Sequence, residues 1–126
     1  MELEYTYTKE PDGWLVGYLN KYPGRLTQGK DVAELEHMLT DIYAIIQDGT
    51  MLGELEWEPV GRQHTGVLRI GTKVLKRQKL PMFGVTLKRH GVGHDIYGIG
   101  KKLIAVPRHS EIDERTAKAI IKFFSD

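Results

Sequence analysis

Charge is divided unevenly along this chain of 126 residues, and the division constrains how the chain can fold. Residues 1–60 carry four Lys and Arg against twelve Asp and Glu, a net charge of −8. Residues 61–126 carry fourteen against five, a net charge of +9. Segments of opposite charge attract each other, and the basic one suits a polyanion such as RNA. We therefore predict two small modules, the acidic one covering the basic one.

Composition excludes several classes of protein. A chain of this length suffices for one ordinary domain or two very small ones. No stretch approaches the roughly 20 apolar residues that span a bilayer, and residues 1–10 lack the basic and apolar blocks of a signal peptide. The absence of cysteine excludes disulfides and thiolate metal sites. These features lead us to expect a cytoplasmic protein that does not contact membranes.

The acidic half is patterned as a hairpin followed by a helix. Apolar and polar residues alternate over residues 3–8 and 14–18, on either side of a Pro-Asp-Gly turn, which predicts two antiparallel strands. A capping-box-like start at Asp31 precedes apolar residues at helical spacing over 35–46, which predicts a helix. Apolar residues over 55–60 suggest a further strand.

The basic half is patterned as three strands between two helices. Residues 73–80 have partial helical character, and Pro81 would end a helix there. Strands are expected on either side of the glycine turn before His94 and again over 103–106. The apolar stripe of residues 117–124 recurs at helical spacing and predicts a last helix that covers this sheet.

We therefore predict an α+β chain made of two small modules. Residues 61–66 are polar and rich in turn formers, so the boundary is placed there. The predicted organisation is an acidic ββ(β)αβ module over residues 1–60, a linker or strand over 61–71, and a basic αβββα module over 72–126.

The stretch from Leu87 to His109 concentrates the residue types that phosphodiester chemistry requires. Cleaving RNA without a metal needs a base for the 2′-hydroxyl proton, an acid for the leaving oxygen, and cations for the phosphate. His94 is the best single candidate, because it follows a Gly-Val-Gly turn and small residues let the backbone approach a ligand closely. Alternation places His94, Ile96 and Gly98 on one face of a strand.

Two other interpretations of these residues are weaker, and a histidine beside glycines is also a common structural residue. A zinc site would recruit His90, His94 and His109, but His90 and His94 bracket a glycine turn and do not share a helix. The Gly-Val-Gly and Gly-Ile-Gly triplets lack the spacing of phosphate-binding loops. We therefore expect no metal and no cofactor.

Three segments of the basic half together resemble the HicA family of small toxin ribonucleases. They read LKRHGVGHDIY over residues 87–97, VPRHSEI over 106–112 and TAKAIIKFF over 116–124. The resemblance covers roughly Gly84 to Phe124. It implies a fold like that of double-stranded-RNA-binding domains, and a metal-independent mRNA interferase activity. The family places its catalytic histidine in the glycine-flanked turn, which corresponds to His94.

The resemblance to HicA also implies roles for individual residues. His94 would act as general base or general acid, and His90 or His109 would supply the second proton-transfer group. Five cations would bind the RNA phosphates: Lys88, Arg89, Arg108, Lys101 and Lys102.

The acidic half resembles the HicB antitoxins that partner this family. The similarity is carried by YTYTKEPDGWLVGYLNKYPGRLTQG over residues 5–29 and DVAELEHMLTDIYAIIQDG over 31–49. It implies a partial RNase H-like domain that binds the toxin and masks its active site. The carboxylate set of true RNase H enzymes is not recognisable, so no catalytic role is expected for this half.

The main interpretation is a HicB–HicA-like toxin–antitoxin fusion, a latent endoribonuclease masked by its own acidic module. Its expected partners are mRNA and the opposite half, met within one chain or across a domain-swapped homodimer. We expect little RNA cleavage by the intact chain. The alternative is a catalytically inactive RNA-binding or protein-interaction module. Pro81 favours this alternative, because it departs from the regular first helix of the HicA family.

Overall fold

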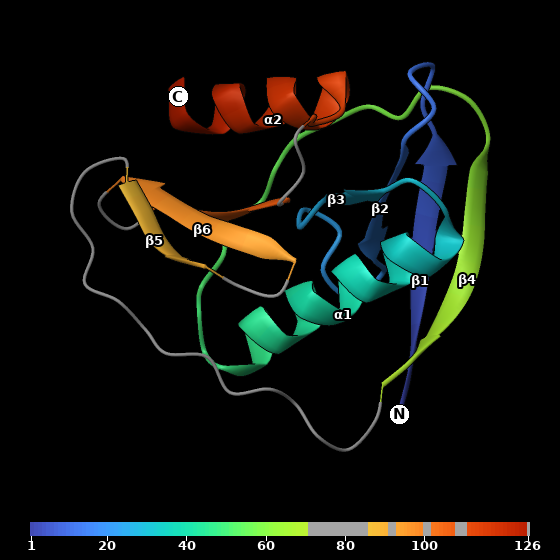
Figure 1. Ribbon diagram of the computed structural model, residues 1–126, viewed down its shortest axis with the longest axis horizontal. Coiled ribbons are helices and arrows are strands. Elements are labelled where there is room, and N and C mark those ends of the chain that lie inside the picture. Colours follow the sequence, from blue (N-terminus) through green and yellow to red (C-terminus); the bar gives the residue numbers. More distant parts are fainter. Residues whose placement is uncertain (71–85, 91–92, 100–101, 108–110, 126) are drawn as a thin grey trace.

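The computed structural model describes residues 1–70, 86–90, 93–99, 102–107 and 111–125. These residues form an α+β structure with two antiparallel sheets and two helices (Figure 1). The α+β class predicted from the sequence is confirmed. No helix in the described part of the chain is long and apolar enough to cross a membrane.

The first sheet has four strands in the order β3-β2-β1-β4. Its strands are β1 (Glu2–Lys9), β2 (Leu15–Leu19), β3 (Thr27–Gly29) and β4 (Gln63–Arg69). The predicted hairpin is β1 and β2, which pair antiparallel. The other edge of β1 pairs with β4, so that Tyr5 lies opposite Gly66.

The predicted first helix is α1 (Val32–Gln47). Asp31 caps it, because its Oδ1 accepts a hydrogen bond from the Glu34 backbone N–H at 2.8 Å. Gly49 ends the helix in the left-handed region, with a φ of 89°. In Figure 1, α1 runs from the first sheet toward β6 of the second sheet, with which it is in contact.

The second sheet and its helix follow the predicted order. The strands are β5 (Thr86–His90), β6 (His94–Ile99) and β7 (Lys102–Pro107), in the order β5-β6-β7, and the helix is α2 (Glu114–Ser125). Asp113 caps α2, because its Oδ2 accepts from the backbone N–H groups of Arg115 and Thr116. His94, Ile96 and Gly98 are all buried on one face of β6, as alternation predicted.

The segment between the helix and β4 differs from its prediction. No strand forms over residues 55–60, because backbone bonds here reach both halves instead of one neighbouring strand. The Gly53 N–H donates to the Leu103 carbonyl at 2.6 Å, and the Leu55 N–H donates to the Gly24 carbonyl at 2.7 Å. Strand β4 lies inside the predicted 61–71 segment and completes the first sheet. The helix predicted over 73–80 and Pro81 lie outside the described residues.

Buried apolar side chains in the described part of the chain form three clusters. One lies wholly within residues 1–70, whereas the other two combine residues from both halves. The first mixed cluster contains Val16, Leu26, Leu55, Ile104 and Ala119. The second contains Ile42, Ile45, Leu52, Ile96 and Ala105. The acidic and basic halves therefore share two apolar clusters.

Candidate functional site

His94 lies at the start of β6 with a fully buried side chain, 0% exposed. Its Nδ1 lies 2.7 Å from Asp41 Oδ2, and its Nε2 lies 2.7 Å from Thr27 Oγ1. Asp41 belongs to α1 and Thr27 to β3, so both partners come from the acidic half. Both ring nitrogens of this candidate residue therefore contact side chains of the acidic half.

Close approach of α1 to the turn before β6 positions these groups. The Gly93 backbone N–H donates to Asp41 Oδ2 at 3.1 Å. A Cβ added to Gly93 would lie 2.8 Å from Met38 Sδ, which is closer than real Cβ atoms come. A larger residue at position 93 would therefore require the Met38 side chain of α1 to shift.

An ionised Asp41 carboxylate determines which ring nitrogen of His94 carries a proton. An ionised carboxylate can only accept hydrogen bonds, so His94 Nδ1 must carry the proton that Asp41 binds. In the neutral ring, Nε2 is then the acceptor, and the Thr27 hydroxyl donates to it. Imidazole in this form is suited to accept a proton at Nε2. His94 and Thr27 are both 0% exposed, so Nε2 contacts Thr27 and not solvent.

Among the other predicted site residues, the structure describes the side chain of Lys102. Lys102 is exposed, with Nζ 3.4 Å from the Phe123 carbonyl and 5.7 Å from the centre of its ring. Because His94 pairs with Pro107 while Lys102 pairs with Ile99, Lys102 lies at the opposite end of the β6–β7 ladder from His94. The structure therefore does not bring Lys102 to His94.

The backbone of β5 runs beside the His94 end of β6. His90 pairs with Asp95 and Arg89 pairs with Ile96, after an irregularity in the register between Leu87 and Arg89. Lys88, Arg89 and His90 are therefore in the strand next to His94, and only their backbone is described. The predicted residues Lys101, Arg108 and His109 lie outside the described residues.

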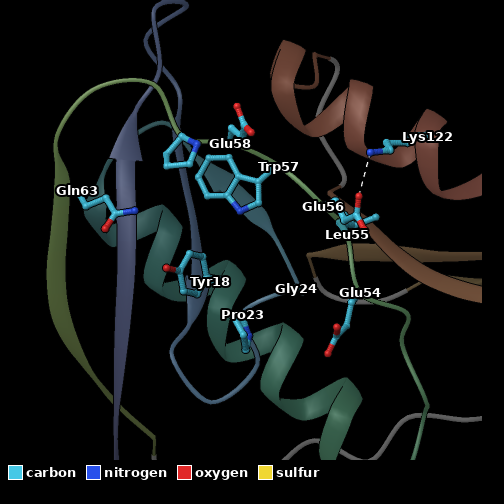
Figure 2. Close-up of a pocket in the computed structure, with 11 residues that line it drawn as sticks. Tyr18, Pro23, Gly24, Glu54, Leu55, Glu56, Trp57, Glu58, Gln63 and Lys122 are labelled. Carbon is cyan, nitrogen blue, oxygen red and sulfur yellow. Dashed lines mark hydrogen bonds and ion pairs between the residues drawn. The ribbon is translucent and has the colours of Figure 1, made fainter.

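An open groove of about 640 Å³ is lined mostly by the acidic half, together with Lys122 of α2 and Gln63 (Figure 2). Tyr18 and Trp57 meet edge to face on its wall, with ring centres 6.4 Å apart. Three glutamates also line it: Glu54, Glu56 and Glu58. Lys122 of α2 is paired with one of them, Glu56, at 2.9 Å. The carboxylates that line the groove repel phosphate, so the groove does not suit RNA.

Sequence reasoning missed both partners of His94. Asp41 left a detectable signal, since it is a carboxylate among buried apolar residues of α1 such as Met38 and Ile42. Thr27 left none, because β3 is only three residues long and follows no alternating pattern. Their separations from His94, 53 residues for Asp41 and 67 for Thr27, hide the cluster from any local motif.

Among the side chains that the structure describes, no three His, Asp or Glu residues are grouped to hold a metal ion. Searches against family models, curated proteins and solved structures gave no match to this chain.

Proposed function

We propose that this chain is a self-masked endoribonuclease, a HicB–HicA-like fusion in which the acidic half covers the catalytic histidine of the basic half. The observation that carries the proposal is the enclosure of His94, whose two ring nitrogens contact Asp41 and Thr27 of the acidic half. Local sequence resemblance to both families supports it. The βββαβ order of the first sheet and its helix, and the βββα order after it, are compatible with a partial RNase H-like module and a double-stranded-RNA-binding-like module.

Masking at this site takes the form of substrate mimicry. In RNA cleavage, Nε2 of His94 would accept the 2′-hydroxyl proton while the 2′-oxygen attacks phosphorus and the bond to the 5′-oxygen breaks. A second acid would protonate that leaving oxygen, and the products would be a 2′,3′-cyclic phosphate and a 5′-hydroxyl. The Thr27 hydroxyl occupies the position from which a 2′-hydroxyl would donate to Nε2. RNA and the acidic half therefore compete for the same ring nitrogen.

Separating the halves tests the proposal. The cut belongs after Ile70, because β4 ends at Arg69 and the Ile70 N–H donates to the Met1 carbonyl. Residues 71–126 expressed alone are expected to cleave RNA and arrest growth, and co-expression of residues 1–70 is expected to restore growth. The intact chain should cleave little RNA.

His94→Ala in the separated basic half is the matched control. It is expected to lose RNA cleavage and growth arrest while still co-purifying with residues 1–70, since the two mixed apolar clusters remain. Equal cleavage by the wild-type and His94→Ala fragments would overturn the role of His94. No cleavage by a wild-type fragment that still binds residues 1–70 would overturn the ribonuclease assignment.

A catalytically inactive interaction module is the second candidate, and the complete burial of His94 favours it. A histidine with a hydrogen-bond partner at each ring nitrogen is also how a structural core histidine is satisfied. In that case the separated basic half is expected to bind RNA with strong salt dependence and leave it intact.

A further inference from the structure

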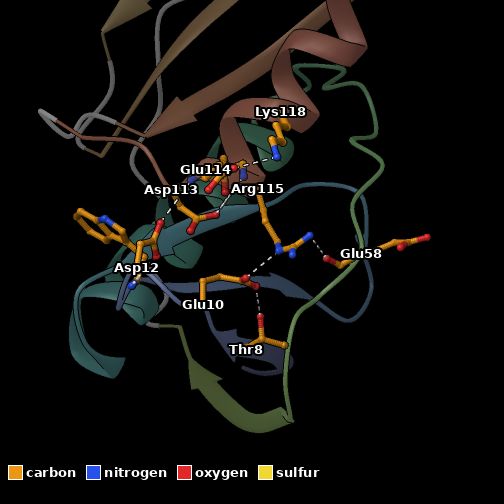
Figure 3. Close-up of polar contacts among 10 residues, drawn as sticks. Thr8, Glu10, Asp12, Glu58, Asp113, Glu114, Arg115 and Lys118 are labelled. Atoms are coloured by element: carbon orange, nitrogen blue, oxygen red, sulfur yellow. Dashed lines mark hydrogen bonds and ion pairs between the residues drawn. The ribbon is translucent and has the colours of Figure 1, made fainter.

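A second cluster of polar side chains lies where the N-terminus of α2 meets the β1–β2 turn (Figure 3). Asp113, which is 1% exposed, caps α2 through Oδ2. That oxygen accepts from the backbone N–H groups of Arg115 at 2.9 Å and Thr116 at 3.1 Å. The Asp113 N–H donates to Gln28 Oε1 at 2.7 Å. Asp113 is thus held in place from both halves.

The other carboxylate oxygen of Asp113 is the unusual feature. Oδ1 is buried and has no hydrogen-bond donor among the described residues. The neighbouring side chain is a second carboxyl group, that of Asp12, whose Oδ2 accepts from the Glu114 N–H at 3.4 Å. Two ionised carboxylates placed together repel each other, whereas one proton held between them turns the contact into a hydrogen bond.

The pKa values of the two groups are displaced in opposite directions. Burial, and then the hydrogen bond to Asp12, raises the pKa of Asp113 to about 6. Burial opposes ionisation of Asp12 as well, but hydrogen bonds from Asp113 and from the Trp14 and Glu114 backbones outweigh it and lower the pKa of Asp12. Asp113 is therefore the member of the pair that loses its proton at the higher pH.

The cations nearest to this pair along α2 are engaged with other groups. Arg115 Nε lies 3.1 Å from Glu10 Oε2, and Arg115 Nη1 donates to the Glu58 carbonyl. Lys118 pairs with Glu114 at 2.9 Å. From β3, the uncharged Gln28 side chain faces Asp113 and also donates to the Glu111 carbonyl. Among the described residues, no cation pairs with either carboxyl group, so neutralisation of the pair there is left to a proton.

We propose that Asp12 and Asp113 form a proton-dependent contact that docks α2 on the β1–β2 turn, closed by one shared proton in mildly acid solution and weakened at neutral pH. The contact joins the acidic half to the basic half. It goes beyond the proposed masking of His94 and does not depend on whether His94 cleaves RNA.

The sign of the pH dependence follows from proton linkage. Docking raises the pKa of Asp113, so the docked state binds more protons than the undocked one between about pH 4 and pH 6. The contribution of Asp113 to docking is therefore fully present below about pH 4 and is lost as the pH rises through about 6. Each unit of pKa difference corresponds to a tenfold change in the docking equilibrium. We expect a loss of roughly ten- to a hundredfold across this window.

Carboxyl-carbon NMR titration of the full chain tests the shared proton directly. Asp113 is expected to titrate near pH 6 and Asp12 below its ordinary range. In Asp12→Asn, the new amide can donate to the Asp113 carboxylate, so the Asp113 midpoint is expected to fall by at least about one unit. A wild-type Asp113 midpoint near 4, or one that Asp12→Asn leaves unchanged, would overturn the proposal.

Asp113→Asn tests the consequence for stability. Asparagine keeps the helix cap and offers Asp12 an N–H donor, so it imitates the protonated pair at every pH. Full-chain urea unfolding at about pH 5 and pH 7.5 should show the wild type losing stability relative to Asp113→Asn at the higher pH. The matched control is Asp31→Asn, the exposed cap of α1, which should follow the wild type. The same pH dependence in wild type and Asp113→Asn would contradict the contact.

Discussion

The residues around His94 show how one buried polar cluster constrains the choice of side chains. Asp41 Oδ2 accepts from both His94 Nδ1 and the Gly93 backbone N–H, so one carboxylate oxygen satisfies two donors. Thr27 satisfies the second ring nitrogen. Each group is buried, and a buried polar group that loses its partner carries the full cost of its desolvation.

Asp41→Ala is therefore expected to lower the free energy of unfolding by about 2 to 4 kcal/mol, because it leaves the His94 and Gly93 donors without their acceptor. Urea unfolding of the full chain measures the loss. The matched control is Thr40→Ala, one residue away on the exposed face of α1, where Thr40 Oγ1 bonds only the Glu36 carbonyl. Similar losses for the two variants would argue against the His94 cluster as a stabilising contact.

At the scale of elements, the helices and hairpins followed from periodicity, and the connection between α1 and β4 did not. The apolar stripes of α1 and α2 and the alternation of β1, β2 and β6 are local patterns that a sequence displays directly. The apolar residues of 55–60 were predicted as a strand, but the structure has none there. Leu55 and the nearby Leu52 are instead buried between the halves, in different mixed clusters.

Two ion pairs connect α2 to the acidic half, one with a buried carboxylate and one exposed. Removing their cations should have different effects on the unfolding free energy. Glu10 is 2% exposed and meets Arg115 at 3.1 Å, whereas Glu56 and Lys122 are largely exposed. Arg115→Ala leaves the Glu10 carboxylate buried with Thr8 as its side-chain donor. We expect a loss of about 2 kcal/mol in unfolding free energy, a value reduced for the partial exposure of Arg115.

Lys122→Ala is the matched control for Arg115→Ala. It removes a cation from the same helix, and solvent replaces its contact with Glu56, so the unfolding free energy should not change measurably. Equal changes in the unfolding free energy for the two substitutions would show that burial of Glu10 does not determine the strength of its contact with Arg115.

At the scale of the whole molecule, opposite charge and a shared core hold the halves together. Residues 1–70 carry a net charge of −6 and residues 71–126 a net charge of +7. Long-range attraction between such fragments is screened by salt, while burial of the two mixed apolar clusters is not. Charge attraction should therefore affect the association rate of the two fragments, whereas apolar burial should determine their dissociation rate.

Association of the separately expressed fragments 1–70 and 71–126 is expected to slow by roughly tenfold between about 0.05 M and 0.5 M salt, with a nearly constant dissociation rate. Surface-immobilised binding kinetics measure both rates. An association rate that is independent of salt would show that the charge division plays no part in assembly.

The sequence by itself determined the local elements, the α+β class and the buried face of β6 that carries His94, because these follow from periods of two and 3.6 residues. Only the tertiary structure decided which groups meet His94 and which carboxyl faces Asp113. The contacts of His94 join residues 53 and 67 positions apart along the chain, and Asp12 meets Glu114 of α2 across 102 positions. Such pairs depend on how the halves pack, and packing is a property of the assembled core that no local pattern encodes.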